Sequence, residues 1–203
     1  ADVIHLHWIN QGLLSLKDLR KLLLLGKPVV WTLHDMWPIT AICHHAWECE
    51  RYRSLCGACP FLNSGKKTDL STRRFERKRE LYYQYNNITL VPVSDWLKEK
   101  CKTSALNPYL PVHTIPNAID TDFFEPGDRA EARRQSDLPG DKTILLMGAA
   151  RIDDPVKGFS FLKEALASVS AKDQDSLLLI LFGHLKDRQI LEGFPVEYRW
   201  LET

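Results

Sequence analysis

Apolar residues along the chain alternate between short uninterrupted runs and helical spacings. The run Thr143-Ile-Leu-Leu-Met147 is typical of a buried strand. After it, apolar residues recur at i, i+3, i+4 and i+7, the spacing of one helix face: Leu162, Ala165, Leu166 and Val169. We therefore predict a strand over 143–148, then a loop, and then a helix over 158–171. A strand over 177–182 and a weak helix over 186–192 continue the series.

The N-terminal part of the chain shows the same alternation. Val3 to Trp8 reads as a buried strand, and residues 28–33 read as the next one. Between them, Ser15-Leu-Lys-Asp18 has the form of a capping box that opens a helix, and Gly26 ends it. A strand, a helix and a strand in this order predict parallel pairing with a right-handed crossover, and hence an α/β fold.

Further elements follow in the N-terminal part. We predict that Ser71 caps a helix over 72–84, that 88–93 is a strand, and that Ser94 opens a short helix containing Cys101 as a buried small hydrophobe. A last strand is predicted over 111–115.

The helix predicted over 72–84 carries a basic stretch, 73–79. Because Glu76 and Glu80 are interspersed with its cations, we interpret this stretch as a solvated helix face. Contact with anionic lipid is the alternative.

The composition changes between 116 and 142, where proline, glycine and charged residues dominate around a short helix at 129–136. We predict one domain over 1–120, a linker over 121–142, and a second domain over 143–203. The chain begins and ends within strand-like sequence, so we expect both domains to be incomplete in it.

One loop of the second domain has the residues of an anion site. Arg151, Lys157 and Gly158 lie between the predicted strand and helix, where free backbone N–H groups and the helix dipole favour a negative charge. Arginine offers a planar fork to phosphate oxygens and lysine a point charge, which suits a diphosphate. Gly183 is predicted to end the next strand at the same ligand-facing edge. A plain loop with two solvated cations is the alternative.

Three segments carry a resemblance to a known family. They are Ala150-Arg151 with Lys157-Gly158-Phe159, the stretch from Ile115 to Pro126, and Thr32-Leu33-His34-Asp35-Met36-Trp37-Pro38. In their order along the chain they resemble the retaining glycosyltransferases of family 4, and the segment from Thr32 to Pro38 resembles a polysaccharide-building, colanic-acid-type bacterial subgroup. Ala118 stands where glycine is usual, and the acidic segment of the family would follow position 203.

The resemblance implies two Rossmann-like domains of the GT-B type. It implies that Arg151 and Lys157 hold the diphosphate of a UDP- or GDP-linked sugar and stabilise the leaving group, with Gly158 and Gly183 at the donor. It also places His34 beside the sugar being transferred, with Asp35 orienting it or facing the acceptor. We count His34, Arg151 and Lys157 as the catalytic candidates, and we expect the excerpt alone to be inactive.

The same resemblance implies partners and a compartment. The acceptor is expected to be a saccharide or a lipid-linked saccharide, and the enzyme cytoplasmic, with peripheral contact at the inner face of the membrane. The net charge of +1 gives no reason to expect a nucleic-acid partner. No apolar run reaches the roughly 18 residues of a membrane span.

The irregular region 34–68 contains four closely spaced cysteines: Cys43, Cys49, Cys56 and Cys59. Cys56-Gly-Ala-Cys59 is a C-x2-C half-site, and four thiolates suit tetrahedral zinc with no open position for water. We therefore predict a structural zinc site. Two disulfides, a redox pair and four free thiols are the alternatives.

Two other functions stay open. The chain is compatible with a non-catalytic module that senses a nucleotide and binds a protein partner through the cysteine loop. A phosphorylase or hydrolase on the same fold is the third hypothesis.

Overall fold

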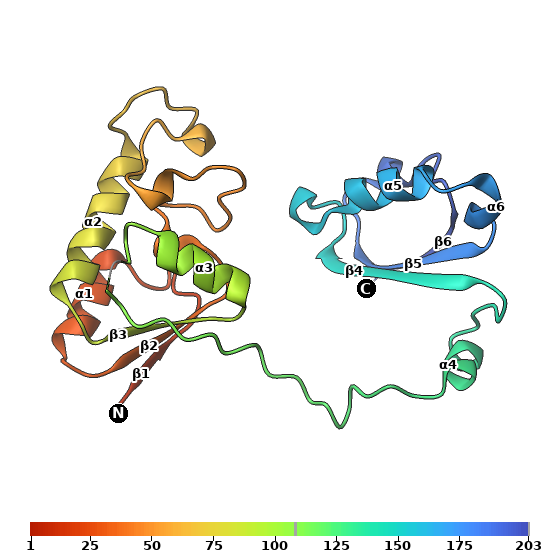
Figure 1. Ribbon diagram of the computed structural model, residues 1–203, viewed down its shortest axis with the longest axis horizontal. Coiled ribbons are helices and arrows are strands. Elements are labelled where there is room, and N and C mark those ends of the chain that lie inside the picture. The colour runs from red at the N-terminus through yellow and green to blue at the C-terminus, as the bar shows by residue number, and fades with distance from the viewer. Residues whose placement is uncertain (108, 203) are drawn as a thin grey trace. The chain divides into compact units, whose positions relative to one another are not determined.

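The computed structural model describes residues 1–107 and 109–202. The chain divides into two compact units, Ala1–Asp120 and Thr121–Thr203 (Figure 1). Each has a three-stranded parallel sheet of its own with helices packed on it, so the predicted α/β class is confirmed. In the described residues, no helix is long and apolar enough to cross a membrane.

The first unit is built on the sheet β1-β2-β3, in that order: β1 (Ile4–Leu6), β2 (Val29–Leu33) and β3 (Ile88–Pro92). Both neighbouring pairs are parallel. β2 alternates between buried and half-buried residues, and its Trp31 is 1% exposed. The parallel pairing of β1 with β2 is the pairing that the predicted order of strand, helix and strand implies.

Helix α1 (Leu16–Leu24) begins at the predicted capping box. The Ser15 hydroxyl accepts a hydrogen bond from Asp18 N, and the Asp18 carboxylate accepts one from Ser15 N. Leu19 and Leu23 are buried, and Gly26 follows the helix with a φ of 64°. The local sequence therefore defines both ends of this helix.

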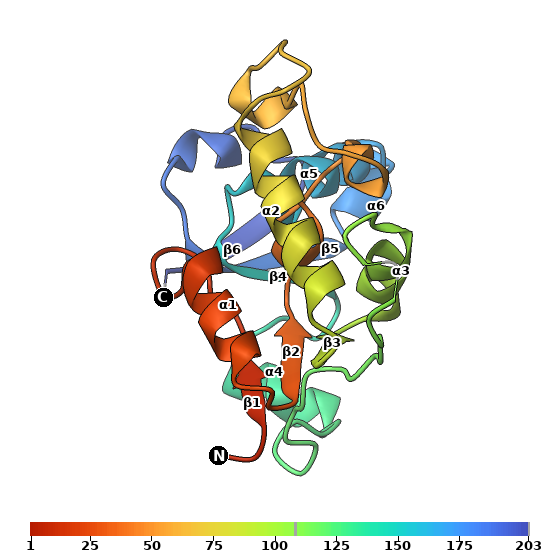
Figure 2. The ribbon, with the colours of Figure 1, turned by 90° about the vertical axis from the view of Figure 1, so that its left-hand side faces the viewer.

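Helix α2 (Leu70–Gln84) runs alongside α1 (Figure 2). The prediction that Ser71 caps it was wrong, because the Asp69 carboxylate accepts from the backbone N–H groups of both Ser71 and Thr72. The solvated character predicted for 73–79 was also wrong at Lys78, which is 1% exposed. Ser94 caps helix α3 (Asp95–Thr103), and Cys101 in this helix is fully buried as predicted.

The long region between β2 and α2 contains three short 3-10 helices: η1 (Trp37–Ile39), η2 (Arg51–Arg53) and η3 (Pro60–Leu62). After α3, the strand predicted over 111–115 does not form, apart from a single bridge between Val112 and Leu90. Pro111 O accepts from Leu90 N and His113 N donates to Leu90 O, so this segment runs extended beside β3.

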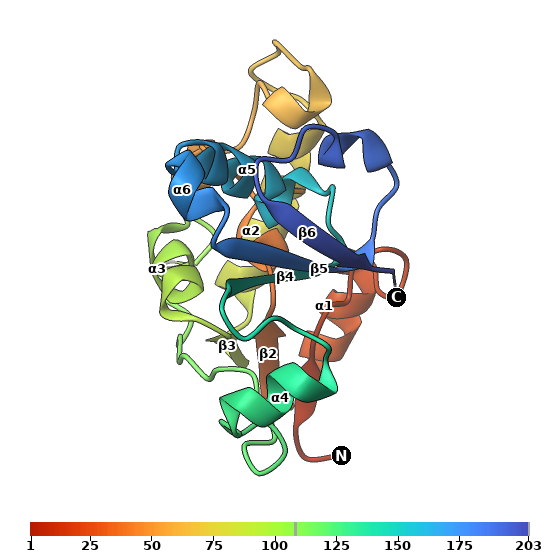
Figure 3. The ribbon, with the colours of Figure 1, turned by 90° about the vertical axis from the view of Figure 1, so that its right-hand side faces the viewer.

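The second unit has the sheet β4-β5-β6 (Figure 3): β4 (Thr143–Arg151), β5 (Leu177–His184) and β6 (Glu197–Leu201). All neighbouring strands are parallel. Its helical elements are α4 (Arg129–Gln135), η4 (Pro155–Lys157), α5 (Phe159–Ala167), α6 (Ala171–Gln174) and η5 (Arg188–Leu191). α5 and α6 lie on one face of this sheet (Figure 1).

Several boundaries in this unit differ from the predictions: the strand predicted over 143–148 continues to Arg151, and the helix predicted over 186–192 is the shorter η5. The helix predicted over 158–171 ends at Ala167, and a new turn begins where the Ser170 hydroxyl accepts from Asp173 N. The prediction that Gly183 ends a strand was wrong, because β5 continues to His184, which pairs with Arg151.

Gly183 allows β4 and β5 to approach each other closely. Its φ is 123°, and a Cβ there would lie 1.8 Å from Ala149 O. The register of the two strands shifts between Gly148 and Arg151, which is where this close approach occurs. Glycine is therefore required by the backbone at this position.

Gly183→Ala should destabilise the second unit by about 2 to 4 kcal/mol, since it adds strain at a positive φ to a backbone clash. Urea unfolding followed by circular dichroism measures the change. Gly140→Ala is the matched control, because a Cβ at Gly140 would meet nothing within 4 Å. Equal unfolding free energies for the two variants would show that the sheet tolerates a side chain at Gly183.

Candidate functional site

The predicted anion loop begins where β4 ends. Arg151 is the last residue of β4, and Ile152 N donates to His184 O just beyond it. Since β4 and β5 are parallel, their carboxyl ends lie at the same edge of the sheet. This is the edge at which open α/β sheets bind ligands.

Arg151 already has acidic neighbours within the loop. Its Nε lies 3.4 Å from Asp153 Oδ1, and a terminal nitrogen lies 4.0 Å from Asp154 Oδ2. The Arg151 side chain is half-exposed, whereas that of Asp153 is 12% exposed. Asp153 Oδ1 receives no well-aligned hydrogen bond in the described residues, so this contact is an ion pair of poor geometry. The guanidinium is therefore positioned by its loop and still accessible.

Lys157 and Gly158 complete the loop. Lys157 is exposed at the end of η4, and Gly158 follows it with a φ of 74°. Gly158 is the N-cap of α5, and no side chain caps this helix. The structure thus places both cations in one loop that leads into an uncapped helix N-terminus, the arrangement that favours anions.

A cavity of about 350 Å³ lies against the start of α5. Its lining includes Asp153, Asp154, Phe159, Ser160 and Lys163. The Lys163 ammonium donates to Ile190 O and Glu192 O, so its charge is held by backbone carbonyls. The cavity walls are therefore mainly acidic and apolar, and they differ in character from the loop that carries the two cations.

The first unit brings histidines together at the end of β2. His34 directly follows β2 and is exposed, and its Nε2 lies 3.1 Å from Nδ1 of His7. The two rings are nearly parallel, with centroids 5.4 Å apart. His7, which we interpreted as a packing or strand-end residue, is thus the immediate partner of the candidate His34. Parallel pairing of β1 with β2 places them side by side, which no local motif indicates.

Asp35 contacts a different histidine. Its Oδ2 lies 2.7 Å from Nδ1 of His44, and its Oδ1 accepts a hydrogen bond from Trp37 N at 2.8 Å. Asn10 Nδ2 lies 3.1 Å from Nε2 of the same His44 ring. Asp35 therefore fixes the turn into η1 and holds His44, a residue that the sequence motifs did not single out.

The four cysteines of the loop are all free thiols. Burial, followed by repulsion from Cys59, Cys56 and Cys49, raises the pKa of the Cys43 thiol to about 11. Burial also raises the pKa of Cys56 to about 11. Without a metal, the thiols of Cys43 and Cys56 would therefore be protonated at neutral pH. In the described part of the chain, no three His, Cys, Asp or Glu side chains have a metal-binding arrangement.

The C-x2-C turn is anchored to α2 by hydrogen bonds. Ala58 has a φ of 41° and donates through its N to Lys66 O. Cys59 N donates to Asp69 Oδ2, an oxygen of the same carboxylate that caps α2. A Cβ at Gly57 would lie 2.2 Å from Lys67 O. The turn thus has a defined backbone of its own, and zinc binding by its thiols stays a prediction.

Comparison with known proteins identifies the family. The sequence profile of glycosyltransferase family 4 matches residues 1–123, which is more than half of the chain. The chain belongs to glycosyltransferase family 4. A colanic acid biosynthesis glycosyl transferase of Escherichia coli (strain K12), WcaC, is 34% identical over 85 residues. That match covers 39% of this chain and 20% of the relative, so the chain spans about a fifth of the relative's length.

The zinc prediction is tested by metal analysis of protein purified under reducing conditions. We expect about one zinc per chain, and loss of that zinc in Cys56→Ser/Cys59→Ser, because a site of four thiolates cannot close after losing two. Cys101→Ala removes a cysteine outside the loop and should leave the zinc content unchanged.

A thiol titration of the denatured, metal-free protein, purified without reductant so that any disulfide persists, separates the alternatives. Five reactive thiols together with zinc in the native protein would support the site. Fewer than five thiols would indicate a disulfide, and five thiols with no zinc would contradict the prediction.

Proposed function

We propose that the protein transfers a sugar from a nucleoside diphosphate donor to a hydroxyl group of an acceptor, with retention of configuration. Membership of glycosyltransferase family 4 supports transfer of a sugar. The observation that carries the donor assignment is the loop from Arg151 to Gly158, with two accessible cations before an uncapped helix N-terminus.

The loop has the groups that a diphosphate requires. The Arg151 guanidinium would bind two phosphate oxygens as a fork, and Lys157 would add a point charge. When the diphosphate binds, it replaces Asp153 and Asp154 as the partner of Arg151, so the protein exchanges one set of charge contacts for another. The backbone N–H groups at the start of α5 add further donors.

The same contacts would serve the chemical step. Negative charge grows on the leaving diphosphate as the bond from the anomeric carbon to its phosphate oxygen breaks. Cations fixed at this position stabilise that charge more than they stabilise the bound donor, which lowers the barrier. Gly183 would support this site indirectly, because it allows β5 to pack closely against β4.

His34 is proposed to face the sugar that is transferred. It is exposed at the carboxyl edge of the first sheet, and its ring is oriented by the contact with His7. A neutral imidazole there can donate or accept one hydrogen bond at a sugar hydroxyl while the other nitrogen contacts His7.

We propose a saccharide or lipid-linked saccharide as the acceptor, on the cytoplasmic side of a bacterial membrane. The similarity to a relative named for colanic acid biosynthesis supports a role in cell-surface polysaccharide synthesis.

Calorimetric titration of the full-length protein with UDP- and GDP-sugars tests the donor site. Arg151→Ala/Lys157→Ala should weaken donor binding about a hundredfold, since each charge-assisted contact contributes about 1.5 kcal/mol or more. The matched control is Lys172→Ala/Lys186→Ala, which removes two exposed cations of the same unit outside the loop. This control should bind like the wild type.

The outcomes separate the competing functions. Donor binding that survives in Arg151→Ala/Lys157→Ala would reduce the loop to a turn with two solvated cations. Binding of a nucleotide that the loop variant abolishes, without any transfer or hydrolysis of the sugar, would favour a nucleotide-sensing module. Phosphate-dependent or water-dependent breakdown of the donor would favour a phosphorylase or hydrolase.

A further inference from the structure

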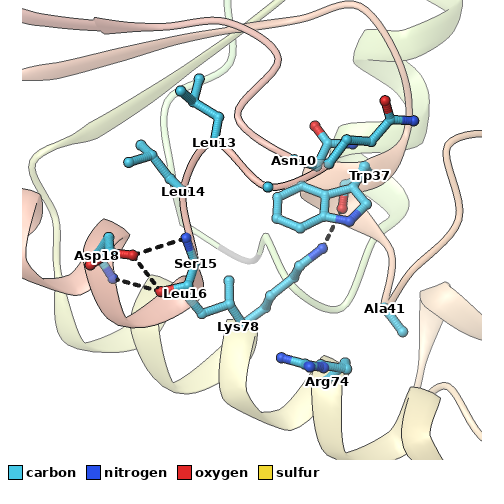
Figure 4. A pocket seen from close by; sticks show the side chains of 12 residues that line it. Asn10, Leu13, Leu14, Ser15, Leu16, Asp18, Trp37, Ala41, Arg74 and Lys78 are labelled. Carbon is cyan, nitrogen blue, oxygen red and sulfur yellow. Dashed lines mark hydrogen bonds between the residues drawn. The ribbon is translucent and has the colours of Figure 1, made fainter.

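A second pocket lies in the first unit. It is lined by two cationic side chains, Arg74 and Lys78, that have no part in the proposed donor binding. Its volume is about 460 Å³, within the usual range for small-ligand sites. The turn after β1, the capped start of α1, Trp37 and the side chains of Arg74 and Lys78 from α2 form its walls (Figure 4). We call it the Lys78 pocket.

Lys78 is buried against backbone carbonyls. Its Nζ donates to Trp37 O at 2.6 Å and to Thr40 O at 3.0 Å, and it lies 3.4 Å from the centre of the Trp37 ring. In the described residues, no carboxylate lies within ion-pair distance of it. Burial therefore lowers the pKa of Lys78 well below its usual value, although Asp35, Cys56 and Cys43 act in the opposite direction.

Arg74 lies one helical turn before Lys78 and lines the same pocket. It is exposed, and it makes no ion pair or hydrogen bond within the described part of the chain. Its charge acts unfavourably on Lys78, as expected of like charges at i and i+4. An anion bound to Arg74 would offset this repulsion.

Asp18 is the carboxylate on the pocket wall, and its charge is already engaged. It accepts hydrogen bonds from Ser15 N and Ser15 Oγ and pairs with Lys21 at 3.4 Å. The hydrogen bonds with Ser15 contribute most to lowering its pKa. The Asp18 carboxylate is therefore already paired with groups at the start of α1. The two cations leave the pocket with a net positive charge.

The opposite wall offers polar groups without charge. Gln11 and Gly12 form a turn with φ values of 59° and 99°, and Asn10 precedes them. The Gln11 amide can donate to oxygen atoms of a ligand that is already held by cations, whereas the Asn10 amide nitrogen already lies 3.1 Å from His44 Nε2.

We propose that the Lys78 pocket binds the phosphate group of a phosphoester or diphosphate ligand, with Arg74 as the bidentate contact and Lys78 as the buried charge behind it. A planar guanidinium matches phosphate geometry, and an ammonium in a dry site interacts strongly with an anion. Its residues belong to the first unit, whereas Arg151 and Lys157 belong to the second, so it would be a second phosphate site of the protein. The phosphate could belong to a soluble ligand or to a lipid headgroup.

The test uses inorganic pyrophosphate as the probe, in the full-length protein carrying Arg151→Ala/Lys157→Ala. This background removes the two cations proposed to bind the donor diphosphate, so the remaining pyrophosphate binding reports on the Lys78 pocket alone. Arg74→Gln should weaken pyrophosphate binding about tenfold or more. Arg77→Gln is the matched control, since it removes an exposed arginine of α2 that does not line the pocket.

A second arm distinguishes the source of the phosphate. Co-sedimentation with phosphatidylcholine vesicles, with and without phosphatidic acid, measures binding to a lipid phosphate. Vesicle binding that Arg74→Gln abolishes and Arg77→Gln retains would support a headgroup ligand. Equal loss in both arginine variants would indicate attraction to the basic helix surface and would overturn the proposal.

Lys78→Met tests the buried charge, with circular dichroism and thermal unfolding as checks of folding. A folded Lys78→Met protein that loses pyrophosphate or vesicle binding supports the proposal. The proposal is wrong if neither probe binds the Arg151→Ala/Lys157→Ala protein, or if Arg74→Gln leaves all binding unchanged. Lys78 would then only connect η1 to α2.

Discussion

Parallel strand pairing is the constraint on which both candidate sites depend. In each unit, the hydrogen bonds between neighbouring strands place all carboxyl ends at one edge of the sheet. His34 follows β2 at this edge of the first sheet, and Arg151 ends β4 at the corresponding edge of the second sheet. In the second unit, the close approach of β5 to β4 at Gly183 sets where Arg151 leaves the sheet. Strand geometry thus determines where the functional side chains emerge.

The features that the sequence predicted well are those in which the interacting groups lie close together along the chain. The capping box of Ser15 and Asp18 is a contact across three residues, so its pattern suffices to locate the start of α1. The loop from Arg151 to Gly158 is equally local, since a strand, two cations and a helix start follow one another directly. Such arrangements need no knowledge of the tertiary structure.

The features that sequence analysis missed depend on distant segments. The contact of His7 with His34 exists because β1 pairs with β2, and Lys78 is buried because η1 packs over α2. A basic helix pattern cannot show which of its cations faces a carbonyl cluster. Asp69 displaced Ser71 as the cap because its carboxylate also accepts from Cys59 N, a contact set by the course of the cysteine loop.

The central claim is that the segment from Arg151 to the start of α5 binds a nucleoside diphosphate. Amide chemical-shift mapping by NMR, with UDP and GDP added to the isotope-labelled chain, tests it directly. We predict that the largest shifts fall on residues 151–162, where the helix N–H groups would meet the phosphates. Shifts confined to other segments, or no shifts with either nucleotide, would contradict the account.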